Sequence, residues 1–233
     1  VTVTFSDGCT DDASVNVTVN PSPVVTPNPI SQYNCSPGSF SINLSSSVPG
    51  TTYSWTRSNT INLTGMPSSG SGSTISGTLT NTTNTLQWEM FHINSDVSGC
   101  PGTTVYAYVY VNPRPTVTAT PATQKICSGN PITPIIMSGT VSGTTYTWTR
   151  DMTDVYGIAN TGSGNISGTL TNNSGAPVTV TFTITPWTGG CTGDPKTATV
   201  IVNPLPPAVA TASPNPVCQG ELMWFSASGG VGY

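Results

Sequence analysis

The chain has 233 residues, enough for two average domains or one large all-β domain, and it carries few charged side chains. With only five Lys and Arg residues and a net charge of −4, it lacks the basic surface through which proteins bind nucleic acid phosphates. Its apolar runs, such as 105–111, alternate with polar residues and are much shorter than the roughly 20 residues that span a membrane.

Residues 1–21 start within a strand-like pattern and contain Cys9 in a short turn. We interpret them as the C-terminal hairpin of a preceding repeat, and we therefore expect the protein to continue upstream of Val1.

Residues 22–113 and 114–204 are two copies of one unit, because three features recur at intervals of 91 or 92 residues. The recurring residues are Asn20, Asn112 and Asn203 before proline, Cys9, Cys100 and Cys191, and Cys35, Cys127 and Cys218. Residues 205–233 then correspond to the N-terminal strands of a following repeat.

Each repeat has the pattern of an all-β domain. Apolar and hydroxyl or aromatic residues alternate over 105–111 and 178–184, while Gly and Pro interrupt the rest of the chain too often for helices. In the second repeat we predict strands near 116–120, 132–138, 144–150, 166–171, 178–186 and 196–202, with the Gly-rich segment 161–164 crossing between sheets. A repeat of about 91 residues suits an immunoglobulin-like β-sandwich with its own core.

A Tyr-x-Trp motif marks one strand of each repeat. Sandwich folds bury a tryptophan at such a position, so we predict that Tyr53, Trp55, Tyr146 and Trp148 belong to the cores. Trp88 and Trp187 precede the Gly-Cys hairpins, and we expect them to be partly exposed.

The joints between repeats are short and rich in proline, which favours extended geometry and semi-rigid spacing. We therefore expect a rod with limited bending. The joint residues are Pro21 and Pro23, Pro113 and Pro115, and Pro204 and Pro206.

These features together resemble the PKD-like repeats of very large secreted and cell-surface proteins, including bacterial adhesins exported by the type IX route. The resemblance covers nearly the whole chain, and its most specific elements are 146–148, 190–193 and 197–204. It implies a β-sandwich, an extracellular location and a stalk or adhesive role, with no catalytic residue. One departure is that the Trp strands continue with Thr56-Arg57 and Thr149-Arg150, where the parent PKD pattern has Asp-Phe-Gly-Asp-Gly.

Two cysteines per repeat at fixed positions predict disulfides and an oxidising compartment. Our first expectation is pairing within a repeat, Cys35 with Cys100 and Cys127 with Cys191. Two alternatives stay open. One pairs Cys9 with Cys35, Cys100 with Cys127 and Cys191 with Cys218 across the linkers. The other pairs Cys35 with Cys191 of the following repeat, because the first turn and the last hairpin of an immunoglobulin-like domain lie at opposite ends.

No residue pattern predicts catalysis. Glu89 and Glu221 are the only glutamates, and His92 has no counterpart in the other repeat and no nucleophile motif beside it. We expect no cofactor. Asp151 and Asp154 come nearest to a calcium-binding spacing, so weak calcium binding at the joints is left open. Sequons such as those at Asn81 and Asn172 are expected by chance in a chain rich in Asn and Thr.

The sequence therefore favours a non-enzymatic, secreted structural segment: the stalk of a surface adhesin or fibre, whose partners are its neighbouring repeats and, through exposed sheet edges, other copies of itself. The alternatives are a module that binds a surface glycan or protein, and a spacer within a secreted hydrolase. No exposed aromatic cluster repeated in register supports the binding module, since Trp88 has Phe182 or Thr183 near its counterpart.

Overall fold

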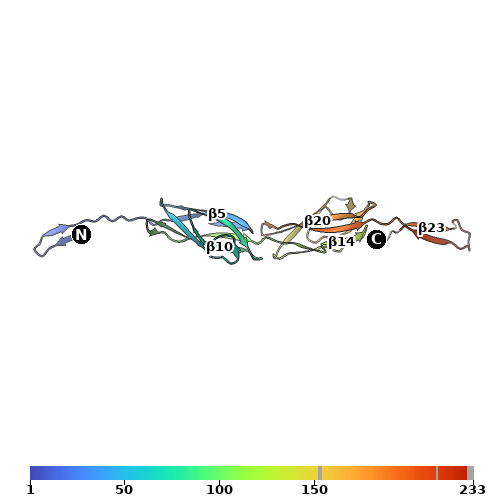
Figure 1. Cartoon of the computed structure of the whole chain (residues 1–233), viewed down its shortest axis with the longest axis horizontal. Helices are drawn as coiled ribbons and strands as arrows, with labels where there is room; N and C mark the ends of the chain where they lie inside the picture. The colour runs from blue at the N-terminus through green and yellow to red at the C-terminus, as the bar shows by residue number, and fades with distance from the viewer. Residues whose placement is uncertain (152–153, 214, 230–233) are drawn as a thin grey trace. The chain divides into compact units, whose positions relative to one another are not determined.

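The computed structural model describes residues 1–151, 154–213 and 215–229. It divides into two compact units, Val1–Pro113 and Arg114–Tyr233, each of which contains one β-sandwich (Figure 1). All regular elements of the described residues are strands, so the prediction of an all-β fold is confirmed.

The first repeat is built from two facing sheets. The smaller has the order β3-β5-β9-β7, with β3 (Val25–Asn28), β5 (Gly38–Ser46), β9 (Thr74–Asn81) and β7 (Leu63–Thr64). The larger has the order β4-β12-β10-β6-β8, with β11 paired to β10; its strands are β4 (Ser31–Cys35), β12 (Val105–Asn112), β10 (Gln87–Val97), β6 (Thr52–Arg57), β8 (Ser69–Ser71) and β11 (Cys100–Pro101).

Period-2 alternation sets which face of each strand is buried. β12 buries Ala107, Val109 and Val111 completely and turns the intervening tyrosines outward. β5 contributes the facing residues Phe40 and Ile42, which pack with Trp55 and Phe91 in a single core.

The first strand of the repeat is shared between the sheets. β3 pairs with β5, and after a turn β4 pairs in parallel with β12, from Ser31 opposite Tyr108 to Cys35 opposite Asn112. The chain therefore enters the repeat at one end and leaves at the other, and Cys35 lies at the outgoing end.

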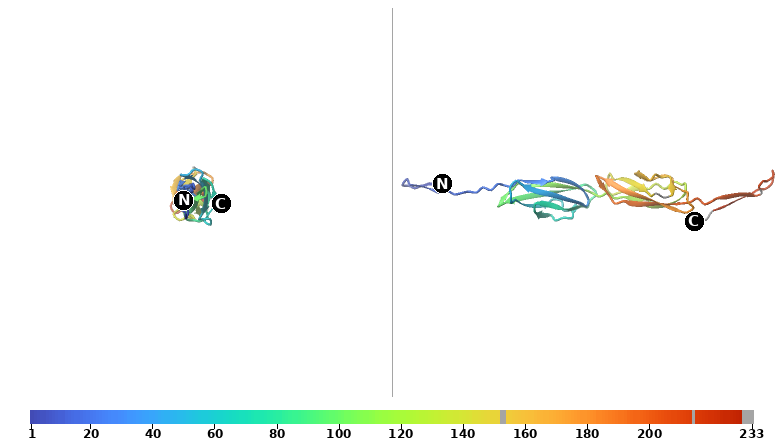
Figure 2. Two further views of the ribbon diagram at one scale, coloured as in Figure 1. Left: turned by 90° about the vertical axis from the view of Figure 1, so that its left-hand side faces the viewer. Right: turned by 90° about the horizontal axis from the view of Figure 1, so that it is seen from above.

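The second repeat, yellow to orange in Figure 2, has the same larger sheet. The order of its strands is β14-β22-β20-β16-β18, with β21 on β20. Its strands are β14 (Thr123–Cys127), β22 (Lys196–Asn203), β20 (Val178–Thr188), β16 (Thr145–Arg150), β18 (Thr161–Ser163) and β21 (Cys191–Thr192). The facing layer is broken into the short pairs β13 (Thr118–Thr120) with β15 (Ile136–Ser138) and β17 (Val155–Tyr156) with β19 (Thr171–Asn172).

Two predicted strands of this facing layer are shorter than expected. Over 132–138 only β15 is regular, and over 166–171 only isolated bridges and the start of β19 form. Pro131 and Pro134 explain the difference, because proline donates no ladder hydrogen bond, and the first repeat has no proline within β5. The segment 161–164, predicted to cross between sheets, instead supplies β18, which pairs with β16.

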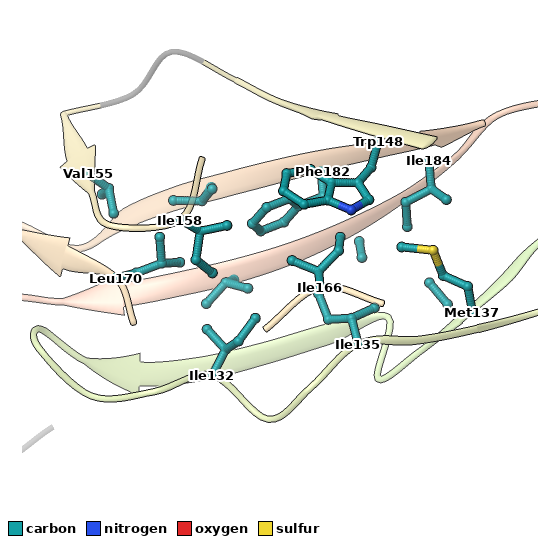
Figure 3. Packing of buried hydrophobic residues seen from close by; sticks show 14 of the residues in the cluster. Ile132, Ile135, Met137, Trp148, Val155, Ile158, Ile166, Leu170, Phe182 and Ile184 are labelled. Atoms are coloured by element: carbon teal, nitrogen blue, oxygen red, sulfur yellow. The ribbon is translucent and has the colours of Figure 1, made fainter. Parts of the chain in front are cut away.

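Each Tyr-x-Trp motif places its tryptophan between the two layers. Trp148 lies edge-on to Phe182, with ring centroids 5.7 Å apart, among Ile166, Ile184 and Met137 (Figure 3). Trp55 and Phe91 repeat this arrangement in the first repeat. Tyr53 and Tyr146 are only partly buried against the cores, and burial raises the pKa of the Tyr146 phenol above its usual value.

The tryptophan needs a glycine opposite it. A Cβ atom on Gly70 would lie 2.4 Å from Trp55 Cζ2, and one on Gly162 would lie 2.2 Å from Trp148 Cζ2. Each glycine is paired directly opposite its tryptophan on the neighbouring strand. The indole packs against the glycine backbone in the space that any side chain at this position would occupy.

The ends of the chain form two exposed hairpins, β1 (Thr2–Thr4) with β2 (Thr10–Asp12) and β23 (Val209–Ser213) with β24 (Trp224–Ser228). Trp224 and Phe225 of the second hairpin are largely exposed. Residues 214 and 230–233 of the segment predicted to begin a further repeat lie outside the described residues.

Candidate functional site

The outgoing end of the first repeat is held together by one buried asparagine. Asn81 Nδ2 donates to the carbonyl oxygens of Thr85 and Val111, each at 2.8 Å, and its Oδ1 accepts from the backbone and the hydroxyl of Thr83. Its backbone N–H donates to the Ser36 hydroxyl at 2.9 Å. The three segments that meet at this end are thereby bonded to one residue, through its side chain and its backbone.

The second repeat reproduces this network bond for bond. Asn172 Nδ2 donates to Ala176 and Val202 at 2.8 Å, its Oδ1 accepts from Ser174, and its N–H donates to the Ser128 hydroxyl at 2.9 Å. Both asparagines are buried, at 8 and 5% exposure. The sequons at Asn81 and Asn172 are therefore structural, because the amide nitrogen that glycosylation would modify is already bonded inside the fold.

The incoming end of each repeat is closed by a glycine against the proline joint. A Cβ atom on Gly102 would lie 2.4 Å from the Pro23 carbonyl oxygen, and one on Gly193 would lie 1.9 Å from that of Pro115. Pro23, Pro113 and Pro115 are buried, whereas Pro21 and Pro206 are exposed and Pro204 is intermediate. The backbone that follows each joint thus packs tightly against the last hairpin of its own repeat.

The cysteines divide between these two ends. Cys35 and Cys127 pair with Asn112 and Asn203 at the outgoing ends, while Cys100 and Cys191 lie in the hairpins at the incoming ends. Cys35 and Cys191 are disulfide-bonded, and Cys9, Cys100, Cys127 and Cys218 are free thiols.

Our first expectation, pairing within a repeat, is wrong for this structure. Cys35 lies level with the end of β12, whereas Cys100 lies opposite Val97, at the far end of β10. The eleven-residue β10 separates the two levels by roughly 30 Å at about 3.3 Å per residue, and a disulfide requires Cα atoms within about 7 Å.

The first repeat also contains a buried ion pair that the sequence analysis did not predict. Arg57 Nε donates to Glu89 Oε2 at 2.8 Å, with both side chains at most 1% exposed. Arg57 further donates to the carbonyl oxygens of Met66, Asn59 and Leu63, and Glu89 Oε1 accepts from the backbone N–H groups of Ser58 and Asn59. Glu89 is therefore a structural carboxylate, with both oxygens occupied.

The second repeat lacks this carboxylate. Strand pairing places Val180 opposite Val200 where Glu89 is opposite Val109, so valine replaces glutamate in the core. Arg150 instead donates to the Val155 carbonyl oxygen and to Asn160 Oδ1. A carboxylate is thus dispensable to the fold at this position.

An aromatic face covers the outer side of the larger sheet in the first repeat. It consists of Tyr33, Trp88, Tyr106, Tyr108 and Tyr110. Tyr33 stacks on Tyr110 with centroids 4.5 Å apart, Tyr110 lies 6.5 Å from Tyr108, and Tyr108 lies 6.2 Å from Trp88. Three of the five are more than two-fifths exposed: Tyr33 at 69%, Trp88 at 48% and Tyr106 at 43%.

A groove adjoins this aromatic face. It has a volume of about 530 Å³, and its lining, which includes Ile30, Tyr106 and Tyr108, contains no charged side chain. His92 lies at the edge of the face, its ring 5.1 Å from that of Tyr106.

The aromatic face is confined to the first repeat. Pairing with β22 sets Thr179 and Ile201 at the positions of Trp88 and Tyr110, so the counterpart of Trp88 is Thr179, and our assignment to Phe182 or Thr183 was wrong. Both of those residues lie further along β20, beyond the position paired with Ile201. Thr199 and Lys125 stand in place of Tyr108 and Tyr33.

The remaining polar candidates form no joint site. Asp151 accepts from the Thr181 N–H at 3.0 Å, and Asp194 forms an exposed ion pair with Arg114 at 2.7 Å. In the described ranges no three His, Cys, Asp or Glu side chains are grouped to hold a metal ion. Among the same residues, no helix has the length and apolarity needed to cross a bilayer.

Solved structures that are similar to this chain include tandem immunoglobulin-like and cadherin domains. The I-band fragment I67–I69 of titin aligns at 10% identity with a TM-score of 0.43, covering 90% of this chain and 77% of its own. Mouse cadherin-23 EC22–24 aligns at 14% with a TM-score of 0.41, covering 83 and 70%, and DIP-gamma IG1+IG2 aligns at 8% with 0.40, covering 79 and 98%. No curated protein matches the sequence.

The family comparison agrees with the period read from the cysteines and with the two sandwiches. The model of the PKD-like domain matches twice, over residues 32–115 and 119–206, and no enzymatic family is indicated. The chain belongs to the PKD-like domain family, of which it contains two tandem copies.

Proposed function

We propose that this chain is a segment of the stalk of a large secreted adhesin or extracellular fibre, exported to the cell surface and supplying reach and rigidity. The observation that carries the proposal is the duplication of the repeat ends. Asn81 and Asn172 close the outgoing ends, and Gly102 and Gly193 close the incoming ends against the joint prolines.

The features that both repeats share lie at the repeat ends. They therefore favour a role in keeping the geometry of successive repeats the same. A domain that binds a ligand through its loops would have kept its ligand contacts in register, whereas here the joint and closure residues are kept and the outer face changes. In an array that continues this period, residues 1–21 and 205–233 belong to the adjoining repeats.

The experiment is to alter the length of the array in the parent protein on its native cells. Deleting residues 114–204 removes one period and connects Asn112-Pro113 to Leu205-Pro206, which restores a single Asn-Pro-x-Pro joint. A stalk predicts that an epitope tag at the distal end moves toward the cell by one fixed increment, and that duplicating 114–204 moves it outward by the same increment. Loss of adhesion with no change in tag height would contradict the proposal.

A second candidate function rests on the aromatic face of the first repeat. Sugar rings stack on aromatic side chains through their apolar faces, and a surface without charged groups suits a neutral glycan. The row from Tyr33 through Tyr110 and Tyr108 to Trp88, beside an uncharged groove, offers several such rings in sequence.

Titration calorimetry with neutral oligosaccharides tests this candidate. Tyr110→Ala should abolish heat release, while the matched variant Ile201→Ala, at the same position of the second repeat, should leave it unchanged. Equal binding by wild type and Tyr110→Ala, or no binding by wild type, would remove the candidate. Concentration-dependent association of the wild type alone would assign the face to contacts between copies instead.

A further inference from the structure

We propose that the groove of the first repeat is a strand-addition site, where the open edge of β12 pairs with an extended, uncharged peptide segment of a partner protein. The inference goes beyond the stalk function and does not depend on it. It rests on the first repeat alone, and it concerns the groove rather than the outer aromatic face.

The edge of β12 is open because the first strand of the repeat changes sheets. β3 ends at Asn28 and pairs with β5 in the smaller sheet, whereas β4 begins at Ser31, opposite Tyr108 of β12. β12 itself begins at Val105, so its residues 105–107 extend past the start of β4. The larger sheet therefore has an unfilled strand position beside them.

The main-chain polar groups of Tyr106 point into this unfilled position. The Tyr108 N–H donates to the Ile30 carbonyl oxygen at 2.9 Å, so the polar groups of Tyr108 face away from β10. Residues two apart on a strand face the same neighbour, and β12 pairs with β10 without a break, so those of Tyr106 face the same way. Within the described part of the chain, no main-chain hydrogen bond engages Tyr106 on that side. One donor and one acceptor are thus available to an added strand.

The groove lies directly beside this edge. Its volume is about 530 Å³, and its lining residues are Val25, Thr26, Pro27, Ile30, Thr104, Val105, Tyr106 and Tyr108. An extended peptide presents alternate side chains on one face, so it can place them in the groove while its main chain pairs with Tyr106.

The lining also selects the chemistry of the peptide. It contains no charged side chain, and a charged residue buried there would lose its hydration without gaining an ion pair. Residues with high strand propensity, such as valine and threonine, suit both the pairing and the apolar wall. The geometry therefore points to an uncharged segment with β-branched residues at alternate positions.

The second repeat protects the corresponding edge. Lys196 takes the place of Val105, because Ile184 pairs with Lys196 as Ile93 pairs with Val105. The corresponding groove is smaller, at about 240 Å³, and Lys196 is part of its lining. Lysine on an edge strand opposes pairing with another chain, because its charge would have to be desolvated. The first repeat has the same edge without this protection.

Hydrogen exchange measured by NMR on the whole chain tests the site. The probe is a synthetic peptide with the sequence of residues 14–20, Ser-Val-Asn-Val-Thr-Val-Asn, with blocked ends, because it is uncharged and alternates valine with polar residues. At saturation it should slow exchange of the Tyr106 N–H by about tenfold or more, and leave that of Thr197, at the same position of the second repeat, unchanged.

Unchanged exchange at Tyr106 would overturn the proposal. Protection of Tyr106 that increases with protein concentration in the absence of peptide would assign the groove to a second copy of the chain, and would overturn the choice of a partner protein.

A pair of variants at Tyr106 separates the main chain from the ring. Tyr106→Pro removes the N–H that the added strand would use, without breaking a bond to β10, whereas Tyr106→Ala removes only the ring. Calorimetry with the same peptide should show binding about tenfold weaker for Tyr106→Pro than for Tyr106→Ala, the loss expected for one hydrogen bond. Equal weakening would mean that the ring binds the peptide, and would overturn strand addition.

Val105→Lys keeps the test decisive if Tyr106→Pro fails to fold, because the second repeat folds with lysine at this position. It should abolish peptide binding. Thr197→Lys, which adds the same charge to the second repeat at an exposed position, is the matched control and should bind as wild type. Undiminished binding by Val105→Lys would overturn the site while leaving the stalk proposal standing, since that proposal depends on the height of the distal tag.

Discussion

At the scale of single residues, the two repeats differ where one contains a buried charge. Arg57 and Glu89 satisfy each other and six backbone or hydroxyl groups inside the first core, whereas Val180 fills the equivalent place in the second. Buried pairs of this kind add little net stability over apolar residues, but removal of one member leaves an uncompensated charge.

Glu89→Val should therefore destabilise the first repeat strongly. Since Arg57 keeps its charge in a site without access to water, we expect the free energy of unfolding to fall by about 3–5 kcal/mol, measured by chemical denaturation. The double variant Arg57→Met/Glu89→Val removes both charges and should recover most of this loss. A single variant as stable as wild type would mean that Arg57 is not held in the core.

The closure asparagines give a second prediction at this scale. Asn172→Ala leaves the carbonyl oxygens of Ala176 and Val202 without their donor and removes the acceptor for Ser174, so the second repeat should lose about 2–4 kcal/mol. Asn43→Ala is the control, because Asn43 is exposed and bonds only Thr74 through its side chain among the described contacts. A loss no larger than that of the control in a urea titration would contradict the closure role.

Residue roles were the part that the sequence revealed least. Asn81 and Asn172 look like sequons because Ser or Thr two residues later is also what their Oδ1 atoms bond. Glu89 looked like a lone acid because its partner Arg57 is 32 residues away, on another strand. Neither role follows from local pattern, since each depends on which strands become neighbours.

At the scale of elements, the alternation of apolar and polar residues predicted most of the strands. The Tyr-x-Trp motif predicted the strand that contributes the core tryptophan of each repeat. They failed at β14 (Thr123–Cys127), which pairs in parallel with β22 and was not predicted. Three of its five residues are polar, so it lacks a strong period-2 signal, and its pairing partner lies some 75 residues further along the chain. The broken facing layer of the second repeat was equally hidden, although Pro131 and Pro134 were a signal that could have revealed it.

The glycine opposite each tryptophan gives a prediction for these elements. In Gly162→Ala the added methyl group would overlap the Trp148 indole, so either β18 or the indole must shift. The free energy of unfolding of the second repeat should therefore fall by about 1–3 kcal/mol. The emission of Trp148 should move to longer wavelength as it becomes more exposed. Gly175→Ala, where no heavy atom lies within 4 Å of the added Cβ, should change stability by less than 1 kcal/mol.

If Gly162→Ala proved as stable as Gly175→Ala, β18 would not lie over the indole. Comparison with Gly70→Ala, the same change in the first repeat, should give a similar loss because Trp55 has the same glycine opposite it.

At the scale of the whole molecule, each of the two repeats has its own hydrophobic core, and a short proline-rich segment joins them. The period of about 91 residues predicted the tandem organisation, because it depends only on residue spacing, and the resemblance of 146–148, 190–193 and 197–204 to known repeats pointed to the PKD-like family. The cysteine pairing could not be settled in that way. Three schemes fitted the spacing, and the level of each cysteine along its sheet was needed to reject pairing within a repeat.

The proposal that the two repeats act as a stiff spacer predicts the shape of the molecule in solution, which small-angle X-ray scattering of the oxidised 233-residue chain measures. A compact globule of this length would have a radius of gyration of about 17 Å. A stiff spacer predicts a value well above this, unchanged by addition of neutral salt. A radius of gyration near that of the compact globule would contradict the proposal.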